Sequence, residues 1–228
     1  MTPITVFHRA DDFLNSLDPR NECFHNYYFP GGWLFRGQRD ARWRLVPSAF
    51  RESVKLIHHE NGWQTGPFSS EREQITHELG CLLSFYGMAD RTGLWIPEDT
   101  QASRHLIRDL EHAIRTNNSL DDQFQRGDLK WPPSELLSLT GIAQHHGMPT
   151  RLLDWTHSAY VAAYFAAAEA AQISMNSPDK LTSDDEIAVW IMSSLNLNFD
   201  SLYGQQRSKE QRILLVTAQN ALNKNLYA

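Results

Sequence analysis

Arg36 is the residue of this sequence whose type and setting best suit binding chemistry. It stands between Phe35 and Gly37 in a run of apolar and aromatic residues that follows two glycines, a pattern typical of a β-strand. Strand alternation puts Phe35 and Arg36 on opposite faces, and a guanidinium inside a covered sheet must be paired or bind an anion. Its planar fork suits phosphate or carboxylate. Gly37 leaves room beside it for a ligand or a second backbone. A salt bridge inside the fold is the alternative.

A second segment with candidate site residues, 145–156, contains Arg151 and Asp154. If residues 151–155 form a strand, Arg151 and Asp154 lie on opposite faces of it. Asp154 is then placed to orient a histidine or an arginine. The alternative is that Asp154 pairs with Arg151, Arg36 or a helix N-terminus and only orders the loop.

Two other kinds of site, a metal centre and a hydrolase triad, are argued against by residue spacing and by a missing motif. The neighbouring His145 and His146 point about 100° apart on a helix, so they cannot serve one metal, and the i, i+4 spacing of a helical zinc site is absent. Asp154, His157 and Ser158 have the composition of a hydrolase triad, but the G-x-S-x-G turn that exposes such a serine is missing. We therefore expect neither a metal centre nor a serine hydrolase.

The stretch around the first strand is rich in arginine and aromatic residues, a composition found in platforms for single-stranded nucleic acid. Its members are Arg36, Arg39, Arg42, Arg44 and Arg51, interleaved with Trp33, Phe35, Trp43 and Phe50. The formal net charge of −6 and the pI near 5.9 argue against a general nucleic-acid binder, which needs a broad basic face. For Arg39, Arg42 and Arg51 we favour a solvated surface.

The elements that must position these residues indicate an α+β fold, in which a helical N-terminal half packs on a mixed β-sheet core. The predicted helices cover residues 7–18, 70–86, 101–116, 132–147 and 159–173. The predicted strands cover residues 33–38, 151–155, 187–192 and 212–216. Ser70 and Glu73 form a capping box, Gly147 is placed to end its helix, and Thr156 or Ser158 caps the helix that follows. We find no domain boundary, so a single domain over residues 1–228 is expected.

The compartment is indicated by what the sequence lacks. Cys23 and Cys81 are the only cysteines of the 228 residues, which argues against a disulfide framework and for a reducing environment. The N-terminus has no charged start followed by an apolar core, and no stretch approaches the ~20 apolar residues that span a bilayer. We therefore expect a cytoplasmic protein without a membrane partner.

Three stretches of the sequence carry a resemblance to a known family. The first comprises Leu34-Phe35-Arg36-Gly37-Gln38 and then Trp43-Arg44-Leu45-Val46-Pro47-Ser48. The second runs from Ala143 to Thr156, and the third is Ala162-Ala163-Tyr164-Phe165-Ala166. Together they resemble the opening, the central signature and the following helix of the FRG domain family, which takes its name from the Phe-Arg-Gly step. The likeness covers about residues 30–228.

The layout of that family is similar to that of arginine-type ADP-ribosyltransferases. The resemblance implies an ADP-ribosyltransferase-like sheet core and NAD as cofactor. It implies that Arg36 grips the phosphates or a ribose of NAD and that Thr156 braces the nicotinamide pocket. The further residues that we expect to bind the cofactor are Gly37, Gln38, His146, Arg151, Asp154 and Ser158. It also implies a protein or nucleic-acid acceptor and a role as a toxin or in defence.

The sequence departs from the transferase pattern at the catalytic carboxylate. The transferases carry a late glutamate, often as Glu-x-Glu, which stabilises the oxocarbenium-like transition state. The run Glu71-Arg72-Glu73 has this spacing but comes too early. Glu210 is the carboxylate near the last predicted strand and is the third catalytic candidate beside Arg36 and Thr156. The family usually continues into a Gln-Gly-aromatic segment where this chain ends at Ala228, so a truncated or degenerate end is expected.

Three functions remain open at this point. The first is an NAD-dependent ADP-ribosyltransferase-like or NAD-cleaving enzyme. The second is a non-catalytic module whose arginine pocket holds a nucleotide or a phosphorylated small molecule, and the missing glutamate favours it. The third, a protein that acts on nucleic acid, is the weakest because the chain is acidic overall.

Overall fold

The computed structural model describes residues 4–24, 32–51, 55–58, 62–65, 68, 70–116, 131–176 and 185–193. The chain forms two compact units, each built from separate stretches of sequence. Unit 1 comprises Met1–Arg44 and Asp154–Leu215, and unit 2 comprises Leu45–Leu153 and Val216–Ala228. The mixture of helices and strands confirms the predicted α+β class.

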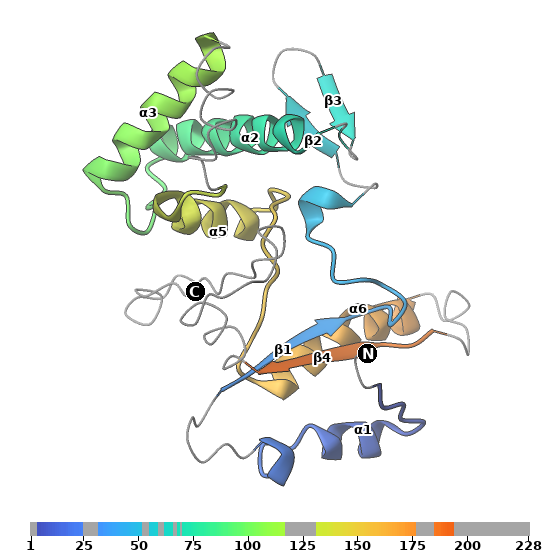
Figure 1. Cartoon of the computed structure of the whole chain (residues 1–228). Helices are drawn as coiled ribbons and strands as arrows, with labels where there is room; N and C mark the ends of the chain where they lie inside the picture. Colours follow the sequence, from blue (N-terminus) through green and yellow to red (C-terminus); the bar gives the residue numbers. More distant parts are fainter. Residues whose placement is uncertain are drawn as a thin grey trace. The chain divides into compact units, whose positions relative to one another are not determined.

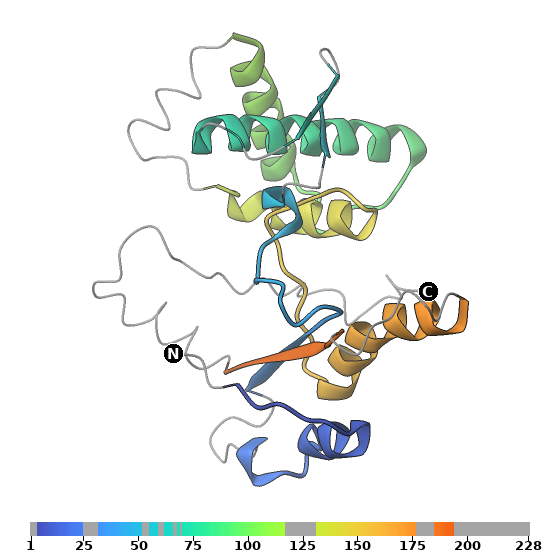
Figure 2. The same cartoon turned by 90° about the vertical axis from the view of Figure 1, so that its right-hand side faces the viewer.

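Unit 1 is built on a two-stranded antiparallel sheet of β1 and β4, with α6 lying along it (Figure 1). Figure 2 shows the same arrangement from the side. The elements are α1 (Ala10–Ser16), a 3-10 turn at Glu22–Phe24, β1 (Trp33–Gln38), α6 (Ala159–Asn176) and β4 (Ala188–Ser193). The predicted strands at 33–38 and 187–192 and the predicted helix at 159–173 are thereby confirmed, the last two with small shifts of their ends.

The two faces of β1 serve different purposes. Phe35 is buried against Ala159, Ala162 and Ala163 of α6, so the odd-numbered residues of β1 face the helix. The partners in the register share their faces, which places Val189 with Gly37 and Trp190 with Arg36. The face turned away from α6 therefore carries Leu34, Arg36, Gln38 and Trp190.

Gly37 marks the closest approach of β1 to α6. A Cβ atom built on Gly37 would lie 1.9 Å from the main-chain oxygen of Ala162 and 2.8 Å from the main-chain nitrogen of Ala166. Both are backbone atoms of the helix, and they cannot turn away as the end of a side chain does. Of the two occupants left open for the space beside Gly37, the helix backbone fills it on this face.

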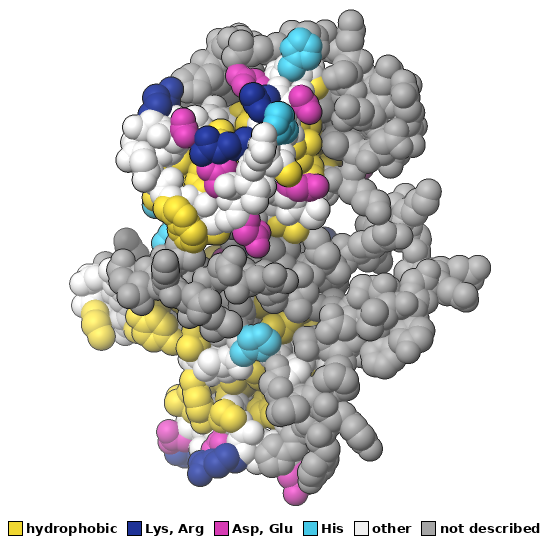
Figure 3. Space-filling model, turned by 90° about the vertical axis from the view of Figure 1, so that its left-hand side faces the viewer, with side chains coloured by type: hydrophobic (Ala, Val, Ile, Leu, Met, Phe, Trp, Pro, Cys, Tyr) yellow, Lys and Arg dark blue, Asp and Glu magenta, His cyan; other side chains and the backbone are white. Residues whose placement is uncertain are grey.

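Unit 2 is mainly helical. Its elements are a 3-10 turn at Ser48–Phe50, the hairpin of β2 (Lys55–His58) and β3 (Gly62–Thr65), α2 (Glu71–Thr92), α3 (Gln101–Thr116), a 3-10 turn at Ser134–Leu136, and α5 (Leu137–His145). The helices enclose a core of buried side chains that includes Leu79, Leu82, Leu110 and Leu139. Charged and histidine side chains gather on the outer side of α3, as Figure 3 shows. Within the described residues no helix is both long and apolar enough to cross a bilayer.

The helix ends follow the predicted capping chemistry. The Ser70 hydroxyl accepts a hydrogen bond from the main-chain N–H of Glu73 at 3.2 Å, which begins α2. At the end of α5, Gly147 has a φ of 87°. Its N–H donates to the Gln144 oxygen at 2.9 Å and the N–H of Met148 donates to the Ala143 oxygen at 2.9 Å, which is a Schellman motif.

Three features concern strands: one predicted strand is absent, one hairpin was not predicted, and one predicted strand lies outside the described residues. Residues 152–155 form no strand; the segment has a single bridge, at Thr156. The hairpin of β2 and β3 was not predicted. The predicted strand at 212–216 lies outside the described residues. The sheet seen in unit 1 is small and antiparallel, and the ADP-ribosyltransferase-like form of the core stays a prediction.

The approach at Gly37 predicts that Gly37→Ala is strongly destabilising. We expect a loss of about 3 kcal/mol in the free energy of unfolding, because the added methyl group overpacks a backbone contact. Denaturant unfolding followed by circular dichroism measures it. Gly141→Ala in α5 is the matched control, because nothing lies within 4 Å of its Cβ position. It should stabilise the protein by up to about 1 kcal/mol. Equal effects of the two substitutions would contradict the close approach.

Candidate functional site

The two predicted site segments of unit 1 are joined by one pair of backbone hydrogen bonds. The N–H of Phe35 donates to the Thr156 oxygen at 2.8 Å, and the N–H of Thr156 donates to the Phe35 oxygen at 2.9 Å. These residues are far apart in the sequence. The bridge therefore brings the Arg36 strand and the end of the 145–156 segment together within unit 1.

Side chains replace the main-chain ladder on both sides of this bridge. Arg36 Nη1 donates to the main-chain oxygen of Asp154 at 2.7 Å. On the other side, His157 Nδ1 lies 3.1 Å from the main-chain oxygen of Trp33, so this nitrogen carries the proton that it donates. A regular antiparallel ladder would pair these positions through backbone groups alone. The predicted strand at 151–155 is wrong: the Asp154 carbonyl accepts from the Arg36 side chain, and the segment is joined to β1 only by the bridge at Thr156.

Ser158 and Thr156 begin α6. The Thr156 hydroxyl accepts from the N–H of Ser158 at 3.1 Å, and the Ser158 hydroxyl accepts from the N–H of Val161 at 3.3 Å. The Ser158 carbonyl accepts the first helical bond, from Ala162 at 3.1 Å. Ser158 is therefore the N-cap, one of the two residues predicted for that role. Both hydroxyls take part in turning the chain into the helix.

The side chains of Arg36 and Thr156 lie on opposite faces of β1. Residues paired across an antiparallel bridge point to the same side, so Thr156 shares the side of Phe35, which faces α6. Arg36, as the next residue of the strand, points to the other side. The bridge brings the two predicted catalytic residues together in space, but it does not turn their side chains toward one another.

Arg36 shares its face with Gln38 and Trp190. Gln38 is only 5% exposed; its Oε1 accepts from Trp190 Nε1 at 2.5 Å and its Nε2 donates to the Arg44 oxygen at 3.4 Å. Trp190 stands directly opposite Arg36 in the β1–β4 register. Sequence reasoning named Gln38 as a binding residue and missed Trp190, because the strand at 187–192 read as a plain buried strand.

Arg151 is held in unit 2 by a buried carboxylate. Its Nε and Nη2 donate to the two oxygens of Glu78 at 2.7 and 3.0 Å. Glu78 is only 5% exposed and also accepts from Trp131 Nε1 at 2.7 Å and from Gln74 Nε2 at 2.7 Å. The guanidinium carbon lies 5.4 Å from the centre of the Phe50 ring. This is the arrangement that a buried ion pair needs, with the carboxylate bonded further and the guanidinium beside an aromatic ring.

The space beside this ion pair is small. A cavity of about 10 Å³ is lined by Glu78, Trp131 and Arg151 together with Leu82 and Met148, which leaves room for about one water molecule. The binding role expected for Arg151 stays a prediction, and the structure gives it a structural partner. Glu78 was missed by sequence reasoning. A signal was present, because Glu78 shares a helix face with Ile75, Leu79 and Leu82 by its spacing.

Thr150 connects the signature segment to Ser48 in unit 2. The N–H of Thr150 donates to the Ser48 hydroxyl at 3.0 Å, and the Thr150 oxygen accepts from the N–H of Ala49 at 3.0 Å. Thr150 Oγ1 donates to the side-chain oxygen of Gln144 and accepts from the N–H of Leu152 at 3.1 Å. Thr150 is buried with its polar groups bonded, which fixes the turn before Arg151.

His146 lies at the end of α5 and is exposed. Its ring lies 5.8 Å from that of Phe85 and 5.6 Å from that of His145. Its expected role in binding stays a prediction. Glu210, the predicted catalytic carboxylate, lies outside the described residues. Across the described part of the chain, no three His, Cys, Asp or Glu side chains gather as a metal ion would require.

The arginines after β1 are engaged within unit 1 rather than arranged as a basic platform. Arg39 lies 3.3 Å from a Glu169 oxygen. Arg42 lies 2.8 Å from Asp40 and 3.8 Å from Asp185. The hydrogen bonds from Arg42 lower the pKa of the Asp40 carboxyl to about 2. These contacts agree with the preferred reading of Arg39 and Arg42 as surface residues.

Comparison with known proteins gave one match. A family model described as the FRG domain matches residues 31–174 of the 228-residue chain. The matched range includes β1, the Glu78–Arg151 pair, the Thr156 bridge and most of α6. No curated protein and no solved structure matched the chain.

The buried pair predicts strong coupling between Glu78 and Arg151. Glu78→Leu or Arg151→Met alone should cost about 3–5 kcal/mol of unfolding free energy, because each leaves the charge of the other partner buried and uncompensated. The double variant should cost less than the sum of the two. The double variant should still lose some unfolding free energy, because Gln74 and Trp131 no longer have the Glu78 carboxylate as acceptor. Denaturant unfolding of all four proteins gives the coupling energy.

The exposed pair of Arg104 and Asp99 in the same unit is the control for this cycle. Breaking it with Arg104→Ala should cost at most about 1 kcal/mol. Additive effects of the Glu78 and Arg151 substitutions would contradict a shared buried ion pair.

Proposed function

This chain belongs to the FRG domain family, and on that premise we propose that the Arg36 face of β1 and β4 binds the phosphate of a nucleotide. This face is the side of the sheet that carries Arg36, Gln38 and Trp190. NAD is the ligand that the resemblance to ADP-ribosyltransferases implies. The observation that carries the proposal is the bond between Arg36 Nη1 and the Asp154 carbonyl, which holds the guanidinium at a fixed point of unit 1.

The chemistry of the guanidinium supports a phosphate as the bound group. A guanidinium has five N–H donors in a rigid fork, and the bond to the Asp154 carbonyl uses one nitrogen. Two parallel N–H donors match a pair of phosphate oxygens.

The surroundings of Arg36 support binding with useful strength. Leu34 and Gln38, its neighbours on the same face, are almost fully buried, and Arg36 itself is half-buried. Charges interact more strongly where protein atoms displace water. A partly buried arginine that is already oriented also loses less entropy when it binds an anion than a free surface side chain does.

A second candidate function is cleavage of NAD at the same face. In this reaction water attacks the anomeric carbon of the nicotinamide riboside, the C–N bond breaks, and nicotinamide, ADP-ribose and one proton are released. Transfer to a protein or nucleic-acid acceptor replaces the water with an acceptor group. The resemblance favours this reaction. The engagement of the Thr156 hydroxyl at the start of α6 favours binding without turnover, because it gives that group a structural task.

Phosphate recognition by Arg36 predicts loss of nucleotide binding in Arg36→Met. We expect wild-type protein to show a higher melting temperature with NAD, ADP-ribose or pyrophosphate, because a bound ligand stabilises the folded state. The affinity measured by calorimetry should fall on the order of tenfold or more in Arg36→Met, because a charge-assisted bond is lost. Arg36→Lys should restore only part of it, because an ammonium lacks the fork.

Arg20→Ala is the matched control for charge in this test. Arg20 is an exposed arginine of unit 1 whose partner is Asp18, and its loss changes the net charge equally. It should leave affinity unchanged. Affinities are compared well below the melting temperature of each variant, since Arg36 also holds the Asp154 segment. Equal affinity of wild type and Arg36→Met for every ligand would rule out the proposed site.

Catalysis predicts release of nicotinamide from NAD. The measurement is chromatography of NAD incubated with the protein, alone and with a mixture of acceptor proteins and RNA. If the protein is an enzyme, release should depend on Arg36 and be absent in Arg36→Met. Binding of NAD with no release under these conditions would leave the binding function standing and exclude the reaction.

A further inference from the structure

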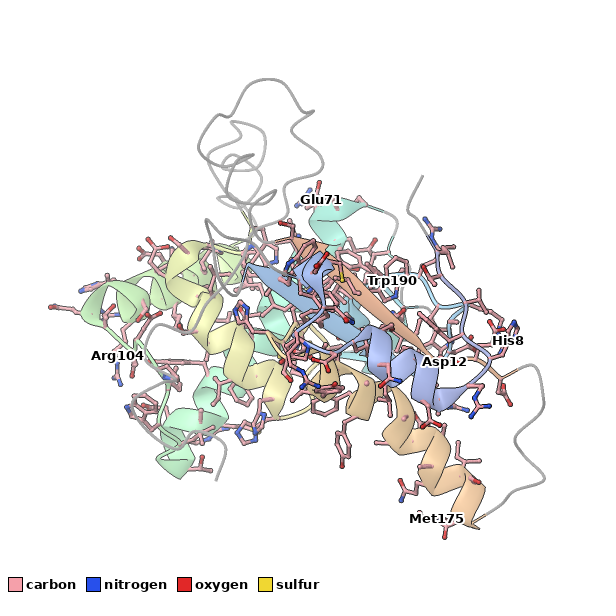
Figure 4. All side chains as sticks on the ribbon, turned by 90° about the horizontal axis from the view of Figure 1, so that it is seen from below. His8, Asp12, Glu71, Arg104, Met175 and Trp190 are labelled. Atoms are coloured by element: carbon pink, nitrogen blue, oxygen red, sulfur yellow. The ribbon has the colours of Figure 1, made fainter. Side chains whose placement is uncertain are left out.

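Trp190 is the aromatic residue nearest to Arg36 across the sheet. The two are directly paired in the antiparallel register of β1 and β4, so their side chains leave the sheet on the same face. Cβ atoms of such pairs lie about 4.5–5.5 Å apart. Figure 4 shows Trp190 on β4. Trp190 therefore leaves the same face of the sheet from the position opposite the arginine that the proposed function assigns to phosphate.

The orientation of the indole is fixed by a buried amide. Trp190 Nε1 donates to Gln38 Oε1 at 2.5 Å, and Gln38 Nε2 is bonded in turn to the Arg44 oxygen at 3.4 Å. Gln38 is anchored at both ends of its amide and is almost completely buried. The indole thus has a defined plane before any ligand arrives, which lowers the cost of stacking a ring on it.

A comparison with Trp33 separates this role from plain packing. Trp33 lies on the opposite face, packs into the cluster of Phe35, Leu17 and α6, and its buried Nε1 has no hydrogen-bond partner among the described residues. Trp190 is not part of that cluster and has a dedicated acceptor. Of the two tryptophans, Trp190 is the one placed on the side of the charged group.

We propose that Trp190 stacks on a planar ring of the ligand whose phosphate Arg36 binds. The Arg36 face then selects molecules that carry both a phosphate and a heteroaromatic ring, which are nucleoside phosphates, over inorganic phosphates. Gln38 is the positioning residue that sets the plane of the indole. This inference rests on the proposed function and adds the part of the ligand that is recognised besides its charge.

The test compares AMP and ADP-ribose with inorganic pyrophosphate on Trp190→Leu and Trp190→Phe. Base stacking on an aromatic side chain contributes about 1–3 kcal/mol, so Trp190→Leu should weaken both nucleotides on the order of tenfold. Trp190→Phe should retain most of their affinity. Pyrophosphate should bind all three proteins equally, because it has no ring, and Arg36→Met should weaken all three ligands.

Ile191→Ala is the matched control on the same strand. Ile191 is 44% exposed and belongs to the opposite face, so its truncation should leave nucleotide affinity unchanged. Circular dichroism and melting temperature establish that each variant is folded. If Trp190→Leu does not fold, wild-type protein decides: it should bind AMP on the order of tenfold more tightly than inorganic phosphate, and equal affinity would overturn the stacking role.

The outcomes separate the two proposals. If AMP binds wild type and Trp190→Leu equally, the stacking role is overturned and the phosphate site stands. If Trp190→Leu weakens pyrophosphate as much as AMP, Trp190 only positions Arg36, and the stacking role is again overturned. If neither nucleotides nor pyrophosphate bind wild type, the proposed function fails and this inference fails with it.

Discussion

The candidate site of unit 1 depends on the two hydrogen bonds between Phe35 and Thr156. They are ordinary backbone bonds, each worth about 1 kcal/mol net, but they join segments that are far apart in the chain. They lie next to the start of α6, where the hydroxyls of Thr156 and Ser158 accept from the N–H groups of Ser158 and Val161. They also bring the Asp154 carbonyl within reach of Arg36. The position of the guanidinium therefore depends on this bridge, whereas the cap of the helix is local.

Each residue of the Phe-Arg-Gly step has a different physical task in this fold. Phe35 is buried against the alanines of α6, which contributes on the order of 2 kcal/mol of hydrophobic stabilisation. Gly37 lets the backbone of α6 approach to a distance that excludes any side chain. Arg36 points to the other face. Two of the three residues are therefore explained by folding alone, and Arg36 is the one to which we assign the proposed binding function.

Local patterns were readable from the sequence and long-range partners were not. The strand at 33–38, the helix caps at Ser70 and Ser158 and the C′ glycine at 147 follow from residue types within a few positions. The strand expected at 151–155 was wrong, because the Asp154 carbonyl there accepts from the side chain of Arg36, a distant partner that no local pattern encodes. The register of strand pairing decides which face of the sheet the Thr156 side chain lies on, and it places Trp190 opposite Arg36. Register depends on two segments together, so neither segment's sequence encodes it alone. The charged residue Glu78 on an apolar helix face did indicate a buried partner, but not which one.

The two arginines of the signature segments differ in what binding an anion would require of them. Arg151 is paired with a buried carboxylate, so a ligand phosphate would have to displace Glu78 or share the guanidinium with it. Displacement breaks a buried pair, at about 3–5 kcal/mol, and leaves Glu78 without its counter-ion. For Arg36 the described bond is to the main-chain oxygen of Asp154, and the phosphate binding that we propose leaves that bond in place. Arg151 therefore holds the turn of unit 2, and Arg36 is the arginine to which the proposed function assigns the ligand.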